Sequence, residues 1–191
     1  MLTTLELRWF CHGTSPPEVQ QWFSNDCPGK PLGLPEERED LYLYTPECDY
    51  LNIKLRQGSL EVKWRKAELG IVQFGNYCEG KVEKWLKWSC KDPSQQSIVP
   101  VDVVGKEPWI AVKKKRSQRL YQGIAYELTQ LRVKEDDWWS IAFEMAGEKA
   151  NQIDSFKGVV SAVSQTYQGS HLLANPSYAY ASWLSRVARP S

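Results

Sequence analysis

The sequence has few of the residues on which common catalytic centres depend. Its 191 residues include two histidines, His12 and His171, which leaves zinc sites and Ser-His-Asp or Cys-His centres poorly supplied. The five cysteines form an odd set without a CxxC pair, a pattern typical of reduced thiols rather than of a disulfide framework. Neither a Walker loop nor a GxGxxG motif occurs. These absences argue against zinc, dinucleotide and P-loop enzymes.

The chain also lacks a strong net charge and a long apolar run. With 24 Lys and Arg against 23 Asp and Glu, its formal charge is +1, so we predict neither a nucleic-acid partner nor a membrane partner. No segment approaches the roughly 20 apolar residues of a membrane span, and Glu6 and Arg8 interrupt the N-terminal segment where a signal peptide needs an apolar core. We therefore expect a cytoplasmic protein with one domain over residues 1–191, in which any anion site is local.

What the sequence does contain is repeated alternation of polar and apolar residues, the pattern of half-buried strands. Strands are predicted over residues 3–10, 40–45, 50–56, 59–66, 80–89, 109–116, 124–133 and 138–145. Gly58 lies between the third and fourth of these segments, where a tight turn predicts an antiparallel hairpin.

Helical patterns occur in three further segments. One follows Ser15 as a predicted N-cap, one lies within residues 151–167, and one begins at an Asn-Pro cap at Asn175. Residues 91–108 are interpreted as a crossover loop. The combination predicts an α+β fold, an antiparallel eight-stranded tunnel-like β-barrel with covering α-helices.

The predicted hairpin has a strongly charged face. Along residues 51–66, one side is apolar and the other consists of Asn52, Lys54, Arg56, Glu61, Lys63 and Arg65. A solvated sheet face with cross-strand ion pairs would explain this pattern. The alternative is the inner surface of a barrel, where so many like charges require carboxylates or a bound anion to neutralise them. The alternation by itself is consistent with both structures.

The order of short motifs along the chain resembles that of the CYTH family, the triphosphate tunnel metalloenzymes. The family opens with ExExK, to which TLELR corresponds, and continues with DxYxDTP, to which DLYLYTP corresponds. The hairpin segment IKLRQGSLEVKWR takes the place of the family's LRxR and LTLK strands. The segments GKVEKW, AVKKKRSQR, AYELT and AFEM follow in the order of the family's RxE, basic, acidic and ExE strands, and PSYAYASWL resembles its C-terminal helix motif. The resemblance runs from Thr4 to Leu184.

The resemblance implies an eight-stranded tunnel that binds a triphosphate or a similar small phosphorylated ligand. The phosphate-binding residues that it implies, with strand parity selecting the inward members of the basic strand, are Arg8, Lys54, Arg56, Lys63, Arg65, Lys114 and Arg116. The metal ligands that it implies are Glu6, Glu127 and Glu144, which would hold Mg²⁺ or Mn²⁺. Glu6 and Glu144 are also the candidate catalytic carboxylates. The implied function is that of a metal-dependent triphosphatase or polyphosphatase.

Three positions depart from the family's motifs. Thr4 stands where the first Glu of ExExK is expected, Tyr44 where DTP has its Asp, and Ala142 where ExE has its first Glu. Fewer carboxylates predict weaker metal binding, with Glu61 and Glu83 as candidate substitutes. A tunnel that binds a phosphorylated ligand without turnover is therefore an alternative to the enzyme.

Two other classes of protein fit the composition less well. A lipocalin-like barrel for an apolar ligand would use some of the nine tryptophans, but its interior should be apolar rather than charged. A single-strand nucleic-acid binder would need a continuous basic stripe, which the sequence does not contain. A basic tunnel for a small phosphorylated anion remains the favoured prediction.

Overall fold

The computed structural model describes residues 1–76, 78–91, 108–148 and 151–188. Most of the expected crossover loop, residues 92–107, lies outside the described residues. The strands are β1 (Leu2–His12), β2 (Lys30–Pro31), β3 (Glu36–Leu43), β4 (Leu51–Arg56), β5 (Ser59–Phe74), β6 (Cys78–Lys91), β7 (Trp109–Tyr121), β8 (Ile124–Val133) and β9 (Asp136–Ala146). The helices are α1 (Pro17–Gln21), the π-helix η1 (Trp22–Asp26), α2 (Gln152–Ser164) and α3 (Tyr180–Val187).

None of these helices combines the length and the hydrophobicity that crossing a membrane requires. All five cysteines are free, as predicted.

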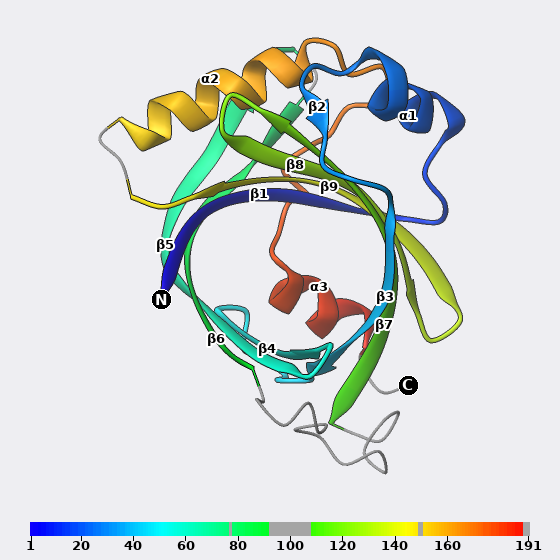
Figure 1. Ribbon diagram of the computed structural model, residues 1–191, viewed down its shortest axis with the longest axis vertical. Coiled ribbons are helices and arrows are strands. Elements are labelled where there is room, and N and C mark those ends of the chain that lie inside the picture. Colours follow the sequence, from blue (N-terminus) through cyan, green and yellow to red (C-terminus); the bar gives the residue numbers. More distant parts are fainter. Residues whose placement is uncertain (77, 92–107, 149–150, 189–191) are drawn as a thin grey trace.

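Of the nine strands in the described residues, eight close into a barrel. Their order is β7-β3-β4-β5-β6-β1-β9-β8, and β8 pairs with β7 to complete the ring. Neighbouring strands around the ring pair in antiparallel fashion. The two-residue β2 pairs with the end of β7. Figure 1 looks along the barrel, and its ring of strands confirms the predicted tunnel-like α+β architecture.

The strand β5 is much longer than the predicted segment that ended at Lys66. It continues to Phe74 through two register shifts in its pairing with β6, one after Arg65 and one after Glu68. Such bulges insert extra residues into one strand and increase its local bend. They also reverse the inward and outward positions, so simple alternation could not follow the strand past Lys66.

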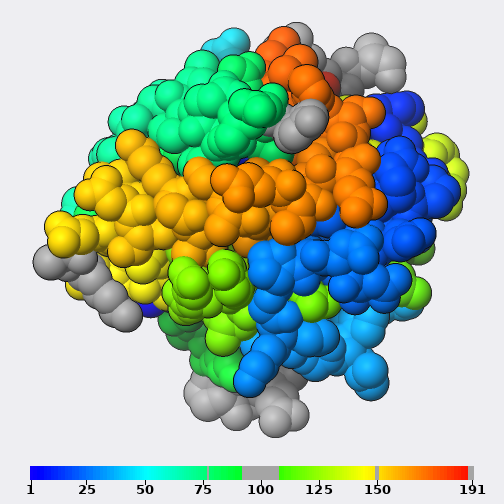
Figure 2. Space-filling model, turned by 90° about the horizontal axis from the view of Figure 1, so that it is seen from above, coloured from blue at the N-terminus to red at the C-terminus, as the bar shows by residue number. Residues whose placement is uncertain are grey.

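One side of the barrel is covered by α1, η1 and α2. The outward-facing side chains of β1, which include Leu5, Leu7 and Trp9, are almost fully buried against this cover. Trp22 of η1 and Phe156 of α2 belong to the same core. Figure 2 shows this face of the molecule, where α2 in orange and the segment after β1 in blue lie across the strands. The main hydrophobic core therefore lies outside the barrel wall and leaves the interior for polar residues.

A second, smaller core fills one end of the barrel interior. Trp183 of α3 stacks on Phe10 of β1, with ring centroids 4.6 Å apart and planes 3° from parallel. The inward-facing residues Tyr42 and Val112 belong to the same core. In Figure 1, α3 appears within the ring of strands. The helix thus closes one end of the tunnel with aromatic side chains.

The two tryptophans at positions 138 and 139 point to opposite faces of β9, as strand parity predicted. Trp139 lies in the main core between the barrel and the covering helices. Trp138 lies against Trp183, with ring centroids 5.9 Å apart. Both therefore pack against hydrophobic neighbours, and neither lines the cavity described below.

The predicted starts of two helices were wrong. Ser15 does not cap α1, whose N-cap is Pro16; the Ser15 hydroxyl instead accepts a hydrogen bond from the Gln130 amide. The last helix begins at Tyr180 rather than near Asn175. The residues before it run alongside β1, with the Phe10 N–H donating to the Pro176 carbonyl at 3.2 Å. Because pairing with β1 satisfies this backbone, the chain remains extended there.

Replacing Trp183 by alanine is expected to lower the free energy of unfolding by about 3–5 kcal/mol, because it leaves a cavity beside Phe10. Trp88→Ala is the matched control, since the Trp88 side chain on β6 is 42% exposed and should contribute much less. Urea denaturation of both variants measures the difference. Equal losses would contradict the buried position of α3 within the barrel.

Candidate functional site

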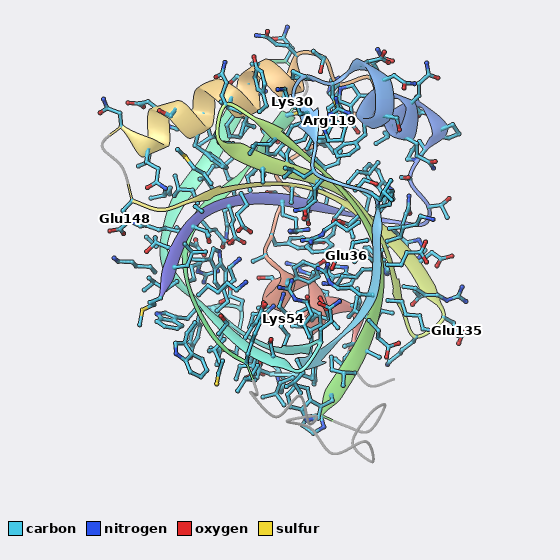
Figure 3. The ribbon with its side chains drawn as sticks, in the orientation of Figure 1. Lys30, Glu36, Lys54, Arg119, Glu135 and Glu148 are labelled. Carbon is cyan, nitrogen blue, oxygen red and sulfur yellow. The ribbon has the colours of Figure 1, made fainter. Side chains whose placement is uncertain are left out.

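The barrel encloses a cavity of about 260 Å³ beside α3. Eight basic residues line it: Arg8, Arg38, Lys54, Arg56, Lys63, Lys87, Lys114 and Arg116. Four acidic residues line it as well: Glu6, Glu61, Glu127 and Glu144. Figure 3 shows Lys54 pointing into the ring of strands, whereas Glu135 and Glu148 project outward. The lining therefore carries an excess of formal positive charge.

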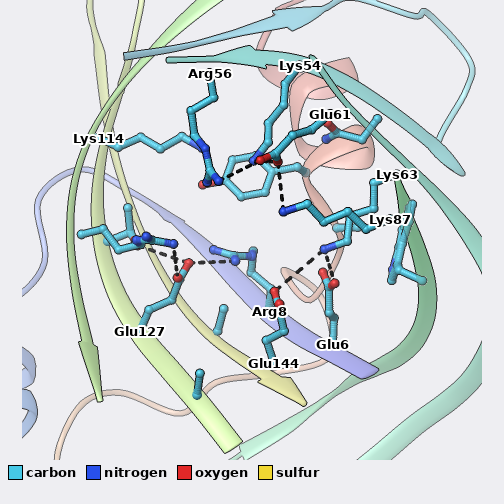
Figure 4. Close-up of a pocket in the computed structure, with 18 of the residues that line it drawn as sticks. Glu6, Arg8, Lys54, Arg56, Glu61, Lys63, Lys87, Lys114, Glu127 and Glu144 are labelled. Atoms are coloured by element: carbon cyan, nitrogen blue, oxygen red, sulfur yellow. Dashed lines mark hydrogen bonds and ion pairs between the residues drawn. The ribbon is translucent and has the colours of Figure 1, made fainter. Parts of the chain in front are cut away.

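The carboxylate of Glu61 joins three cations from neighbouring strands. It lies 2.9 Å from the Lys54 ammonium and 2.7 Å from the Arg56 guanidinium, both on β4. The Lys87 ammonium on β6 lies 3.3 Å away (Figure 4). Burial alone would raise the pKa of Glu61, but these cations, Lys54 foremost, lower it to about 2. Glu61 therefore stays ionised at any physiological pH.

The carboxylate of Glu127 likewise pairs with two cations, on the other side of the cavity. It lies 2.8 Å from the Arg8 guanidinium and 3.5 Å from that of Arg116. Burial opposes ionisation, yet the two guanidinium groups lower the pKa of Glu127 to about 2. Arg8 also donates a hydrogen bond to Ser140 at 3.1 Å. The ion pairs tie β8 to β1 and β7, and the hydrogen bond ties β1 to β9.

The third group consists of Glu6, Glu144 and Lys63. Glu6 on β1 and Glu144 on β9 are cross-strand partners, so their side chains leave the wall side by side. The Lys63 ammonium forms an ion pair with Glu6 and lies 3.9 Å from Glu144 (Figure 4). Burial would raise the pKa of Glu6, but Lys63 lowers it below its usual range. For Glu144, burial keeps the pKa above its usual range despite Lys63, and the Glu6 charge adds to that effect.

The closed end of the cavity holds Lys114 among aromatic rings. Its ammonium lies 2.9 Å from the Asp40 carboxylate and donates a hydrogen bond to the Tyr42 hydroxyl. It also lies 4.1 Å from the ring centroid of Tyr180, and the Arg8 guanidinium lies 4.8 Å from the same ring. Tyr180 belongs to α3, so the helix that closes one end of the tunnel also supplies part of the cavity wall.

Two lysines of the cavity have depressed pKa values. Burial, together with the positive charge of Lys114, lowers the pKa of Lys54 to about 7, although Glu61 acts in the opposite direction. Burial also lowers the pKa of Lys114 to about 8, against the opposing effect of Asp40. Both lysines therefore lose their charge at a lower pH in the empty cavity than they would in water.

Most of the residues predicted to form the site line this one cavity. They are Glu6, Arg8, Lys54, Arg56, Lys63, Lys114, Arg116, Glu127 and Glu144. Arg65 does not line it. Its guanidinium is held by Asp49, Glu68 and Glu83, each at 3.0 Å, in a separate ion-pair cluster. Strand parity predicted the orientation of these side chains, but it could not predict which ion pairs each would form.

The three predicted metal ligands do not form a metal-binding cluster. In the described parts of the chain, no three His, Cys, Asp or Glu side chains lie close enough together to hold a metal ion. Glu127 is engaged by two arginines, and Glu6 is engaged by Lys63. The carboxylates that Mg²⁺ or Mn²⁺ would need are thus already paired with Lys and Arg side chains. The residues present therefore do not fit the expected metal site.

Among the lining residues that sequence reasoning missed are Lys87, Arg38 and Tyr180. Lys87 could have been found, because Glu83, Trp85 and Lys87 share one face of β6 by simple alternation. Arg38 lies before the predicted start of its strand at residue 40, and the observed β3 begins at Glu36. Tyr180 lies within the PSYAYASWL motif, but nothing in that motif indicated that the helix α3 enters the barrel.

No family model matches the sequence, and no curated protein matches it. Among solved structures, the capping-enzyme triphosphatase of mimivirus has a TM-score of 0.54 and 11% identity, over 87% of this chain and 90% of that one. The PH1012 protein from Pyrococcus horikoshii OT3 has a TM-score of 0.51 and 13% identity, over 91% of this chain and 93% of that one. At these identities the likeness concerns the fold. The chain therefore has the tunnel fold of these two proteins, as its resemblance to the triphosphate tunnel metalloenzymes predicted.

Proposed function

We propose that this protein binds a small phosphorylated polyanion, such as a triphosphate or a nucleotide, inside the barrel. The observation that carries the proposal is the convergence of basic side chains from β1, β3, β4, β5, β6 and β7 on one enclosed cavity. Such an arrangement is costly for an empty protein, because like charges repel strongly where water is restricted. A bound polyanion would offset that repulsion.

The chemistry of the lining suits phosphate oxygens. Guanidinium groups such as those of Arg8, Arg56 and Arg116 can donate two parallel hydrogen bonds to one phosphate. Lysine ammonium groups add compact positive charge at other points of the chain of phosphates. The cavity of about 260 Å³ lies just below the roughly 300–1,000 Å³ of pockets for drug-sized ligands. A small and highly charged ligand matches both its size and its charge.

The alternatives explain the lining less well. An apolar ligand of the lipocalin type would leave eight basic side chains, most of them charged, against hydrocarbon, which is unfavourable. A solvated sheet face would place these side chains on the outside of the barrel, whereas they line its interior. The charged hairpin face is therefore an inner surface.

The mimivirus protein of the same fold is named a triphosphatase, which makes hydrolysis the natural second activity to test. In this chain the carboxylates predicted as catalytic, Glu6 and Glu144, adjoin Lys63. Binding is the function that we propose, because the cation-rich lining supports it without a metal ion. Phosphate release from tripolyphosphate and ATP, with and without Mg²⁺ or Mn²⁺ and with Glu144→Ala beside the wild type, tests turnover.

The first prediction concerns affinity. Isothermal titration of the wild type with inorganic tripolyphosphate should show one binding site, and Lys87→Gln and Arg56→Gln should each weaken it at least about tenfold, because each removes a charge-assisted hydrogen bond. Lys66→Gln is the matched control, since Lys66 on β5 is half exposed and pairs with Glu148 instead of lining the cavity. A wild type that binds neither tripolyphosphate nor ATP would overturn the proposal.

The second prediction concerns pH. A bound polyanion favours the charged form of Lys54 and Lys114 and should raise their pKa values from about 7 and about 8 toward the ordinary 10.5. Binding therefore takes up protons above pH 7, and affinity should fall as pH rises from about 7 to about 10, by at most about tenfold per pH unit for each lysine.

Titrations in two buffers of different ionisation enthalpy measure this proton uptake. Lys54→Met should reduce it at pH 8, whereas Lys115→Met should not, because Lys115 is 59% exposed and pairs with Glu37. The comparison also corrects for protons that the ligand itself gains or loses. Equal uptake by the wild type and Lys54→Met would show that Lys54 does not contact the bound charge.

A further inference from the structure

Lys63 lies where the resemblance to metalloenzymes would place a divalent cation. Glu6 and Glu144 project side by side from paired positions on β1 and β9, the arrangement of two carboxylates that could share one cation. The ammonium of Lys63 on β5 forms an ion pair with Glu6 and lies 3.9 Å from Glu144. Thr4 donates a further hydrogen bond to Glu6 at 2.5 Å.

We infer that Lys63 takes the place of a metal ion, so that the cavity binds its phosphorylated ligand without a divalent cation. This inference rests on the proposed function and adds to it that the cation between Glu6 and Glu144 is the Lys63 ammonium rather than a metal ion. The ammonium is covalently attached, so it contributes its charge at every metal concentration. A divalent ion entering between Glu6 and Glu144 would have to displace it.

The remaining carboxylates of the lining offer no second place for a metal. Glu61 is surrounded by Lys54, Arg56 and Lys87, at 2.7 to 3.3 Å. Glu127 is held between Arg8 and Arg116. A divalent cation near either carboxylate would meet two or three fixed positive charges at short range, which is unfavourable.

The departures from the metalloenzyme motifs agree with this interpretation. Thr4 and Ala142 stand on β1 and β9 where the family's motifs have carboxylates, and each is at most 3% exposed. Restoring either carboxylate would add a negative charge near Glu6 or Arg8. With those charges absent, the Glu6 and Glu144 pair is faced by the single ammonium of Lys63.

The decisive experiment removes the ammonium and measures metal binding directly, without any phosphorylated ligand. Titration with Mn²⁺, followed by the electron paramagnetic resonance signal of the free ion, should show weak or no binding by the wild type. Lys63→Met should bind Mn²⁺ at least about tenfold more tightly, because it frees two adjacent carboxylates. Lys66→Met, which removes a half-exposed lysine from the same strand, should behave like the wild type.

The double variant Lys63→Met with Glu144→Gln identifies the site of the gained metal. It should lose most of the Mn²⁺ affinity that Lys63→Met gains, because one of the two carboxylate ligands is gone. If the wild type and Lys63→Met bind Mn²⁺ equally, Lys63 does not take the place of a metal. If Lys63→Met fails to fold, the wild-type titration still decides, since tight Mn²⁺ binding there would overturn the inference.

A second measurement links the inference to the ligand. The dissociation constant of the wild type for tripolyphosphate, measured by calorimetry in EDTA, should not tighten when Mg²⁺ is added. A tightening of tenfold or more would overturn metal independence and leave the proposed polyanion binding intact. Absence of tripolyphosphate binding in both conditions would instead overturn the proposed function, while the Mn²⁺ titrations would still test the role of Lys63.

Discussion

Compensation of positive charge inside a closed barrel is the constraint on which the rest of this structure depends. Closing the sheet turns one face of every strand into an interior, and on this chain that face is rich in Lys and Arg. Each interior carboxylate is therefore shared: Glu61 joins cations of β4 and β6, and Glu127 joins those of β1 and β7. The ion pairs that make the cavity suitable for an anion are also the contacts that connect the barrel strands across its interior.

Two positions that depart from the metalloenzyme motifs, Thr4 and Ala142, contact or adjoin the charged groups of the interior. Thr4 is fully buried and uses its hydroxyl to support the Glu6 carboxylate. Ala142 is the cross-strand partner of Arg8, and its small side chain leaves the guanidinium free to reach Glu127 and Ser140. Both substitutions replace a carboxylate with a group that needs no cation. The interior therefore holds fewer carboxylates than the metalloenzyme motifs would supply.

Much of the fold could be predicted because hydrophobic alternation is a local property of strands. The period of two residues identified all eight barrel strands, and it placed Lys54 and Lys63 on one charged face, which the structure shows to be the inner one. The prediction from alternation and capping patterns failed at the end of β5 and at the start of α3. The bulges after Arg65 and Glu68 extend β5 beyond its visible pattern, and pairing with β1 delays the last helix to Tyr180. In both places a long-range backbone contact overrides the local preference.

The sequence by itself determined which side chains share a face of each strand, because that depends only on parity along the strand. It also determined that one of the two faces would be rich in Lys and Arg, and closure of the barrel decided that this face is the inner one. Only the tertiary structure decided how these charges are paired. Arg65 and Lys63 lie two residues apart on the same face, yet Arg65 is held in a separate ion-pair cluster with Glu83, whereas Lys63 lies between Glu6 and Glu144. That difference arises from strands that are distant in sequence, since an ion pair depends on distances of a few ångströms that only the closed barrel establishes.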